Sequence, residues 1–494
     1  MKKRSHRKGT PSQSQRPHKE LPKPALTVVN PNAAGIDVGS TSHYVAVPPN
    51  AVPADESAVR EFGAFTADLD QLVEWVKACG VTTVAMESTG VYWIPAFQKL
   101  ETAGIEVVLV NAKRVKHVPG RKTDVADCQW LQQLHTFGLL SGSFRPDDLV
   151  CQLRTLMRHR GNLVSEAASC IHRMQKACQE INLHLHHAVS DITGETGLRI
   201  LRAILAGQRD PAELVKLRDP QITKSTEEEM KKALEGDWRA EHLFVLQQNL
   251  DAWEFWHEQM ARCDRQVEQV LQKFPTGQPP AADPLYPEIK PEVIPAIDVE
   301  AGSKPAAAGL KKKTRQSRKQ NDPILDLVPE LTRLCGFNLC DAAGFRVLSV
   351  LSLISEVGLD MSRWRDDKAF SSWLGVCPNN KISGGRVLSR STRRVVHRAA
   401  TTLRLAARGV SNTDSWLGHF YRRMKARLGP AGAITATAHK LACIVYHLLK
   451  YKTPYVEIKA SAYVERIAKA RLGKLKKQAE ALGFQLVKME APTK

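Results

Sequence analysis

Apolar residues recur in two rhythms along the N-terminal third of the chain. Short β-rich runs bounded by turn residues predict strands, and apolar residues three or four positions apart predict helices. The resulting order is three strands, a helix, a strand, a helix, a strand and a helix. This order is typical of a mixed sheet with buried parallel strands and crossover helices. The elements are expected at 33–38, 43–47, 59–65, 69–79, 82–86, 91–100, 106–110 and from 124 onward.

Two long stretches in the middle of the chain have the spacing of coiled-coil helices. One begins near Leu153 and the other near Leu243, and each keeps an apolar seam at alternating steps of three and four residues. We expect the two helices to pair either with each other or with a second chain. The first is also basic, which predicts a surface that is part phosphate-binding and part dimer seam, with a solvated helix face as the alternative. Its basic residues are Arg154, Arg158, His159, Arg160, His172, Arg173 and Lys176.

The helical pattern stops at a stretch rich in proline and lysine, residues 276–323, which predicts an extended linker. A helical domain is expected from Ile324, with a buried helix over 342–357. A loop is expected over 375–386, because Asn, Pro and paired Gly favour turns. Apolar residues at helical spacing among lysines predict a basic amphipathic helix over 463–486.

The predicted fold class is therefore α/β followed by all-α. The chain divides into a basic tail at 1–32, an α/β catalytic domain at 33–145, a helical coiled-coil region at 146–275, the linker at 276–323, a helical C-terminal domain at 324–460 and a basic C-terminal helix at 461–494.

The distribution of charge predicts a nucleic-acid partner. Net charge is +20, and Ile324–Lys494 holds 29 Lys and Arg against 12 Asp and Glu. A basic surplus of this size favours binding to a polyanion. No apolar run is long enough for a membrane span or resembles a signal peptide. The ten cysteines are scattered, as expected for reduced thiols in a cytosolic protein.

Four acidic residues are expected near the carboxyl ends of the strands, where open α/β sheets place their functional side chains. Asp37 lies in the first strand and Glu87 at the end of the fourth, while Asp124 and Asp127 are one turn apart at the start of the last helix. Acidic residues suit a helix N-terminus, which is the simpler interpretation of the last two. Four carboxylates at one pole of a sheet repel each other unless cations bind, so the set predicts a Mg²⁺ site for phosphodiester chemistry.

Ser383, which precedes two glycines in the predicted loop, is a second candidate. A serine that attacks a phosphodiester needs guanidinium groups nearby to stabilise the developing charge. By chemistry alone, a Ser-Gly-Gly turn beside a basic helix is ordinarily only a DNA-contacting turn. The arginines that follow this serine are Arg386, Arg390, Arg393, Arg394 and Arg398.

Histidine is the remaining residue type with possible metal chemistry. His184, His186 and His187 lie close in sequence, without a partnering Cys or Glu at metal-ligand spacing. The sequence therefore favours a polar cluster at a helix end over a metal site.

In these acidic segments the chain resembles a known family, the bacterial insertion-sequence family one-ten transposases. The resemblance rests on the strand-borne Ile36-Asp37-Val38, on the E-S-T-G-x-Y-W segment at Glu87–Trp93 and on the K-T-D-x-x-D segment at Lys122–Asp127. It implies a RuvC-like, RNase H-like domain whose DEDD site is made of Asp37, Glu87, Asp124 and Asp127.

Residues 374–407 and 433–440 resemble the C-terminal transposase domain of the same family. That domain supplies a serine implied to form a covalent link to DNA, and the serine of its S-G-G motif corresponds to Ser383. Many relatives carry Gly-Asn shortly before the next helix, where this chain has Ser391-Thr392. Ser389 and Ser391 therefore remain alternatives for the nucleophile.

The resemblance implies a transposase that cuts and rejoins donor and target DNA under the guidance of a non-coding bridge RNA, with Mg²⁺ or Mn²⁺ at the acids. We expect a cytoplasmic, nucleoid-associated homo-oligomer, a dimer or a tetramer in the synaptic complex, with no membrane partner. Two alternatives stay open: a Mg-dependent junction-resolving nuclease without a covalent serine intermediate, and a nucleic-acid-binding scaffold without chemistry. The expected nucleic-acid contacts are Arg121, Lys122, Arg386, Arg390, Arg393, Arg394 and Arg398.

Overall fold

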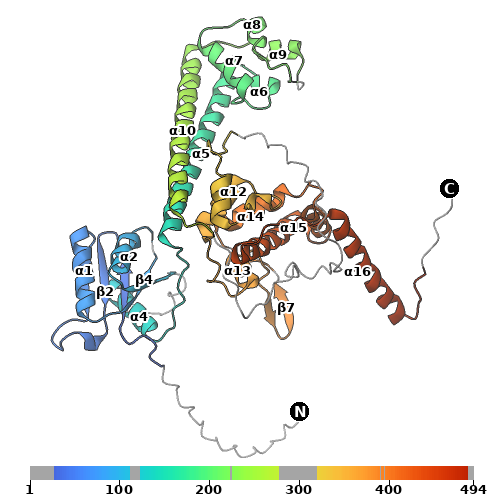
Figure 1. Cartoon of the computed structure of the whole chain (residues 1–494). Helices are drawn as coiled ribbons and strands as arrows, with labels where there is room; N and C mark the ends of the chain where they lie inside the picture. Colours follow the sequence, from blue (N-terminus) through green and yellow to red (C-terminus); the bar gives the residue numbers. More distant parts are fainter. Residues whose placement is uncertain are drawn as a thin grey trace, which may run out of the picture. The chain divides into compact units, whose positions relative to one another are not determined.

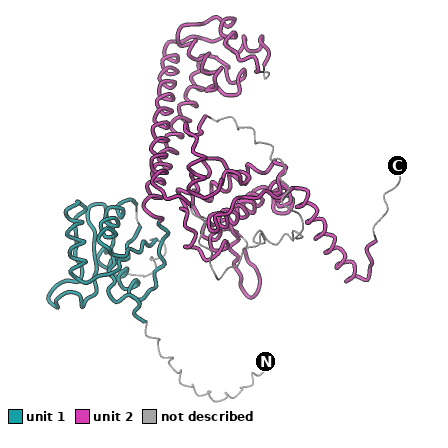
Figure 2. The backbone as a smooth tube through the Cα atoms, in the orientation of Figure 1, with its two compact units in different colours: residues 1–145 teal, residues 146–494 magenta. Residues whose placement is uncertain are grey.

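The computed structural model describes residues 27–88, 90–111, 123–222, 225–277, 320–389, 391–393 and 395–487. The chain separates into two units, residues 1–145 and residues 146–494, which have different colours in Figure 2. The first unit holds a mixed five-stranded sheet with helices, and the second is mostly helical. Most of the predicted tail and of the predicted linker lies outside the described residues.

The sheet of the first unit has the strand order β3-β2-β1-β4-β5. The strands β1 (Ala33–Val38), β2 (Ser42–Ala46) and β3 (Val59–Gly63) form an antiparallel meander. The strands β4 (Thr83–Glu87) and β5 (Glu106–Val110) continue from the other edge of β1 and are parallel to it. The predicted order of strands and helices is confirmed, and the carboxyl ends of β1, β4 and β5 point the same way.

Different helices cover the two faces of this sheet. The helices α1 (Thr66–Ala78) and α2 (Trp93–Thr102) contribute to one apolar core, in which Ile36 and Met86 are fully buried. The helix α4 (Asp124–Thr136) packs on β1, β2 and β4. A short 3-10 helix, η1 (Pro49–Ala51), lies between β2 and β3.

The contact between α4 and β1 is closest at Gly35. A Cβ atom at this position would lie 2.3 Å from both Cys128 O and Gln132 N, which are backbone atoms of α4. Backbone atoms cannot rotate away as a side chain can, so only glycine allows this approach. Beside it, Thr83 Oγ1 on β4 is 2.9 Å from His135 Nε2 on α4. The face of the sheet that carries Gly35 and Thr83 is therefore the face that α4 covers.

The second unit is built on two long helices, α5 (Asp148–Glu180) and α10 (Ala240–Lys273), which lie side by side (Figure 1). The predicted apolar seams of both helices are largely buried, so the pairing occurs within the chain. Arg160 interrupts the first seam and is itself buried, where its Nε donates to Asp264 Oδ1 at 2.5 Å. Asp264 Oδ2 also accepts from Ile324 N at 3.0 Å, so the buried ion pair joins α10 to the start of the C-terminal region.

Short helices connect α5 to α10 at the far end of this hairpin (Figure 1). They are α6 (Leu185–Ala188), α7 (Glu195–Leu205), α8 (Pro211–Val215) and α9 (Glu227–Ala233).

In the C-terminal residues that the structure describes, the regular elements are helices and one β-hairpin. These elements are α11 (Val328–Cys335), η3 (Leu339–Asp341), α12 (Val347–Val357), α13 (Asp367–Trp373), β6 (Lys381–Ser383), β7 (Arg386–Ser389), α14 (Arg398–Gly409), α15 (Trp416–Tyr451) and α16 (Ala460–Ala481). No helix in the described part of the chain is long and apolar enough to cross a membrane.

One prediction for this region is wrong in detail. The buried helix expected over 342–357 begins only at Val347, because Gly344 has a φ of +87° and lies in a turn against Ala406 O. The predicted C-terminal helix is present as α16, and none of its residues is fully buried. Near its start it contacts α15, where the ring of Tyr463 lies 5.9 Å from that of Trp416.

Replacing Gly35 by Ala is expected to destabilise the first unit by about 1–3 kcal/mol, because the added methyl group overlaps the backbone of α4. Denaturant unfolding followed by circular dichroism measures this change. The control is Gly142→Ala, where the new Cβ meets only Val108 Cγ1 at 3.4 Å. We expect the control to stay within about 0.5 kcal/mol of the parent protein. Equal losses in the two variants would contradict the packing described here.

Candidate active site

Asp37 and Glu87 lie at the carboxyl ends of two neighbouring parallel strands. Ile36 on β1 is paired with Met86 on β4, so Asp37 and Glu87 are the next residues along each strand. Neighbouring strands are about 4.8 Å apart, and residues in register point to the same face. The two carboxylate side chains therefore project from the same face of the sheet, at the same end.

That face is the one covered by α4. Side chains alternate along a strand, so Asp37 shares a face with Gly35, and Glu87 shares a face with Thr83. Gly35 and Thr83 both meet α4, at Cys128 and at His135. The alternate residues, Ile36 and Met86, instead belong to the apolar core with α1 and α2. The acids thus project toward α4 and away from the apolar core.

The helix α4 runs in the opposite direction to β1. Gln132 Nε2 donates to Ala33 O at the start of β1, at 3.3 Å, while Cys128 O lies over Gly35 further along the strand. Following α4 further toward its N-terminus, and β1 further toward its carboxyl end, places the first turn of α4 beside Asp37.

Asp124 and Asp127 belong to this first turn. Thr123 begins the helix: its Oγ1 accepts from Ala126 N at 3.2 Å, and its carbonyl accepts from Asp127 N at 2.9 Å. This N-cap fixes the first turn, in which residues three apart lie on one face. The predicted helix start is confirmed, and Asp124 and Asp127 share a helix face as expected.

The pKa of the Cys128 thiol indicates that Asp37 on β1 and Asp127 on α4 both lie near this thiol. Burial raises the pKa of this thiol to about 12, and the Asp37 carboxylate is the next contribution in the same direction. A smaller contribution comes from Asp127. A carboxylate on β1 and another on α4 therefore act on the same buried atom.

Two further polar residues beside these acids, Tyr44 and Glu61, were not predicted from the sequence. Tyr44 on β2 is paired with Asp37 and with Glu61 on β3, so all three share a face. A hydrogen bond to Glu61 raises the pKa of Tyr44, and the charge of Asp124 adds to it. Only the hairpin register, centred on the turn after β1, would have pointed to them.

The donor set suits a hard divalent cation, because carboxylate oxygens are the ligands that Mg²⁺ prefers. All four acids are at one pole of the sheet, on β1, β4 and α4. Their ligand atoms do not form a closed cluster: in the described part of the chain, the one group of three or more potential ligands found together is His184, His186 and His187. The acids therefore fit a hard divalent cation by the chemistry of their donor atoms.

Ser383 lies at the end of β6, in a hairpin where a loop was predicted. It is paired with Arg386 on β7, and the two residues between them are Gly384 (φ +53°) and Gly385 (φ +75°). Two central residues with positive φ define a type I′ turn, which matches the twist of a hairpin. Ser383 and Arg386 are both exposed. The Asn, Pro and paired-Gly signals were interpreted as a loop because the two strands are too short to show alternation.

The alternative serines lie at the base of the hairpin. Ser389 Oγ and Ser391 Oγ are 3.0 Å apart, and Ser391 N donates to Ser389 Oγ at 3.2 Å. The carbonyl of Ser391 accepts from Asn379 N at 3.0 Å. Their hydroxyls are thus engaged with each other, whereas Ser383 is at the solvent-exposed turn.

Of the arginines after Ser383 that the structure describes, only Arg386 is placed beside it. Arg386 faces it across the hairpin, but Arg393 Nη2 donates to Ser372 O, and Arg398 Nη1 lies 3.9 Å from where a Cβ of Gly161 on α5 would stand. The remaining predicted contacts lie outside the described residues: Arg121, Lys122, Arg390 and Arg394.

The basic face of α5 is smaller than the sequence predicted. Arg158 donates to both oxygens of the buried Glu356 carboxylate, at 3.0 and 2.9 Å, and Arg154 donates to the carbonyls of Ser355 and Glu356, at 3.0 and 2.9 Å. Together with the buried Arg160, these residues hold the unit together, which corrects their assignment to a phosphate-binding surface. The exposed remainder is His159, His172, Arg173 and Lys176.

Two family models match the chain. Residues 34–183 match a transposase family of the IS110 type named for its DEDD acids, and residues 338–422 match the Transposase IS116/IS110/IS902 family. The first match includes all four acids and the second includes Ser383. No curated protein matches the chain.

These matches define a transposase, an enzyme that transfers phosphoryl groups in DNA. Over these two ranges the chain is similar to the IS110 family of DEDD transposases. This similarity implies DNA as the substrate and a divalent metal as cofactor.

The turn beside Ser383 can be tested through Gly384. Gly384→Val is expected to destabilise the hairpin by about 1–2 kcal/mol, because a branched side chain is strained at positive φ. Gly384→Asn is the matched control, since Asn-Gly favours a type I′ turn. Hydrogen exchange at the amides of Ser383 and Arg386, the pair that closes the turn, should accelerate only in the valine variant. Equal exchange in both variants would contradict the turn.

Proposed function

We propose that the first unit is an RNase H-like, RuvC-like catalytic domain and that Asp37, Glu87, Asp124 and Asp127 hold Mg²⁺ or Mn²⁺ at a scissile DNA phosphate. The observation that carries this proposal is the adjacency of Asp37 and Glu87 on parallel strands, facing the first turn of α4. The meander of three antiparallel strands followed by two parallel ones supports the fold assignment.

When bound, the metal supplies positive charge to the phosphate oxygens and to the leaving oxygen. The chain's own part is to place four negative charges where they would otherwise repel each other. Asp37 and Glu87 are fixed by strand pairing, and Asp124 and Asp127 by the helix cap at Thr123. This prior fixation means that little reorganisation is needed when substrate binds.

For the nucleophile we propose Ser383. Its hydroxyl is exposed beside a glycine turn that leaves room for a DNA backbone, and Arg386 lies across from it to face a phosphate. In the step proposed, a bond forms between Ser383 Oγ and phosphorus while the bond from phosphorus to a deoxyribose oxygen breaks. The serine proton is lost and the leaving oxygen gains one, so no redox partner is needed. Attack by the freed hydroxyl of another strand reverses the step and rejoins DNA.

The partners proposed are donor DNA, target DNA and a non-coding bridge RNA, bound by an oligomer of this chain. The basic surplus of the C-terminal third and the exposed Arg386 of the serine hairpin support contact with nucleic acid. The guide RNA and the dimer or tetramer rest on the resemblance to the family. The acids belong to the first unit and the serine to the second. The proposed step requires both at one phosphate, and they can come from one chain or from two chains of the oligomer.

Asp124→Asn is expected to lower Mg²⁺-dependent DNA cleavage by about 100-fold or more, because a charged ligand worth several kcal/mol of stabilisation is lost. The rate of strand cleavage, measured in single-turnover assays, tests this. Asp70→Asn is the control, because Asp70 lies on α1 and is paired with Lys99 at 2.5 Å. Unchanged cleavage in Asp124→Asn, or full cleavage in a chelator, would contradict the metal site.

Ser383→Ala is expected to abolish a covalent protein–DNA adduct on a denaturing gel, while Ser389→Ala and Ser391→Ala retain it. The reason is that only Ser383 among the three combines exposure with a position at the turn. An adduct that persists in Ser383→Ala and disappears in Ser389→Ala or Ser391→Ala would identify that other serine as the nucleophile. Metal-dependent cleavage without any adduct would favour a junction-resolving nuclease in which water attacks.

A further inference from the structure

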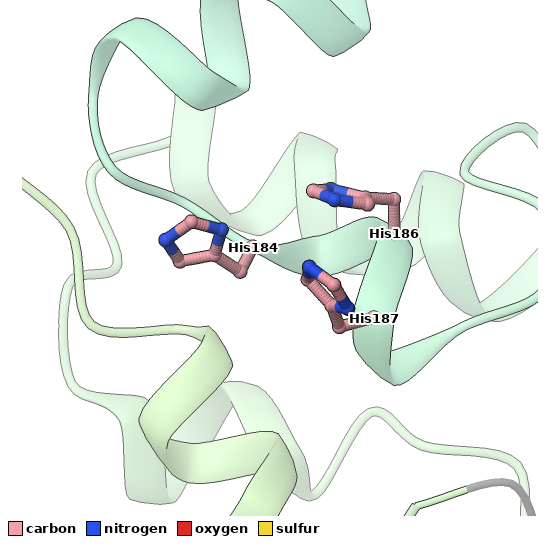
Figure 3. A group of neighbouring side chains, drawn as sticks. All are labelled: His184, His186 and His187. Carbon is pink, nitrogen blue, oxygen red and sulfur yellow. The ribbon is translucent and has the colours of Figure 1, made fainter.

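Three histidines that have no part in the proposed reaction meet at the far end of the α5–α10 hairpin. They are His184, His186 and His187, and Figure 3 shows their rings grouped around the start of α6. One ligand atom from each lies within 4.8 Å of the other two. The ring centroids of His186 and His187 are 4.2 Å apart, and that of His184 is 6.0 and 5.7 Å from them.

The backbone that carries these rings is held firmly. Leu183 and Leu185 are fully buried on either side of His184. His184 N donates to Ala233 O at the end of α9, and His187 N donates to His184 O, both at 2.9 Å. The apolar side chains and these bonds fix the backbone from which the three imidazoles project, so an ion would need only side-chain adjustment to bring their ligand atoms together.

Asn182 selects the form of His184 that can bind a metal. His184 Nε2 is 3.0 Å from Asn182 Oδ1, which can only accept a hydrogen bond, so Nε2 carries the proton. The other ring nitrogen, Nδ1, is then left with its lone pair. A hydrogen bond from the second ring nitrogen is the usual companion of a metal-bound histidine. Asn182 also has a φ of +55°, a left-handed conformation that brings its side chain into place.

We propose that His184, His186 and His187 form a binding site for a borderline divalent cation of the Zn²⁺ class. Three imidazole nitrogens suit Zn²⁺, Co²⁺, Ni²⁺ or Cu²⁺, whereas Mg²⁺ prefers oxygen. Three protein ligands leave a further coordination position for water or another donor. His187 is exposed, which gives the ion a path from solvent.

Such a site would stabilise the helical cap that links α5 to α10. The three ligands come from four consecutive residues and α6 has only one turn, so the ion would fix that turn. Because His184 N is bonded to Ala233 O, fixing His184 also restrains the end of α9. Free energy of metal binding then becomes free energy of folding for this cap. The site is separate in residues and in metal preference from the acidic site.

The test uses the full chain without a purification tag of histidines, freed of metal by a chelator. Titration with Co²⁺ is expected to produce the visible absorption of four-coordinate cobalt, and competition with a chromophoric chelator gives the affinity for Zn²⁺. His186→Ala and His187→Ala should remove this binding. Asn182→Ala should weaken it by about 10–100-fold, as is usual when a partner of a metal-bound histidine is lost.

His172→Ala is the matched control, since His172 is an exposed histidine of α5 outside the cluster, and it should bind as the parent protein does. Circular dichroism of each variant shows whether the fold is kept, and His187→Gln retains a polar side chain if alanine perturbs the cap. Binding unchanged in folded His186→Ala and His187→Gln would overturn the proposal, as would the absence of cobalt absorption in the parent protein. Either result would leave a polar cluster at a helix end.

Discussion

The acidic site depends on one steric constraint, the contact between α4 and β1 at Gly35. Because no Cβ fits between the strand and the backbone of Cys128 and Gln132, the helix can lie directly on the sheet. The same contact sets the direction of α4, so that its capped first turn comes to the end of β1. A strand and a helix that are far apart in sequence thereby present their carboxylates to one region. A single methyl group at Gly35 would separate the two halves of the site.

The basic surplus of the chain serves two purposes that composition cannot separate. Arg154, Arg158 and Arg160 hold α5 against α12 and α10 through Glu356 and Asp264. Buried pairs of this kind are costly to break, because the remaining partner is left charged and desolvated. The charges available to nucleic acid are the exposed ones, including Arg386 beside the serine turn. The hairpin at Ser383 and the DEDD acids belong to different units, and each is positioned by its own local contacts.

Much of this arrangement follows from local patterns. The alternation and helical spacing of the N-terminal third predicted the sheet, its crossover helices and the strand and helix positions of Asp37, Glu87 and Asp124. The sequence could not predict contacts that depend on register. Tyr44 and Glu61 join Asp37 only through antiparallel pairing, and the three histidines come together only because buried leucines and Ala233 fix their backbone. The hairpin was missed because its strands, of three and four residues, are too short to show a clear alternation of apolar and polar residues.

The proposed metal site joins four acids from β1, β4 and α4 around one hard divalent cation. Mn²⁺ binding to the full chain, followed by electron paramagnetic resonance, tests this site without relying on catalysis. We expect Glu87→Gln and Asp127→Asn each to weaken Mn²⁺ binding, while His186→Ala leaves it unchanged. Equal Mn²⁺ binding by the parent protein and by Glu87→Gln would show that the four acids do not form this site.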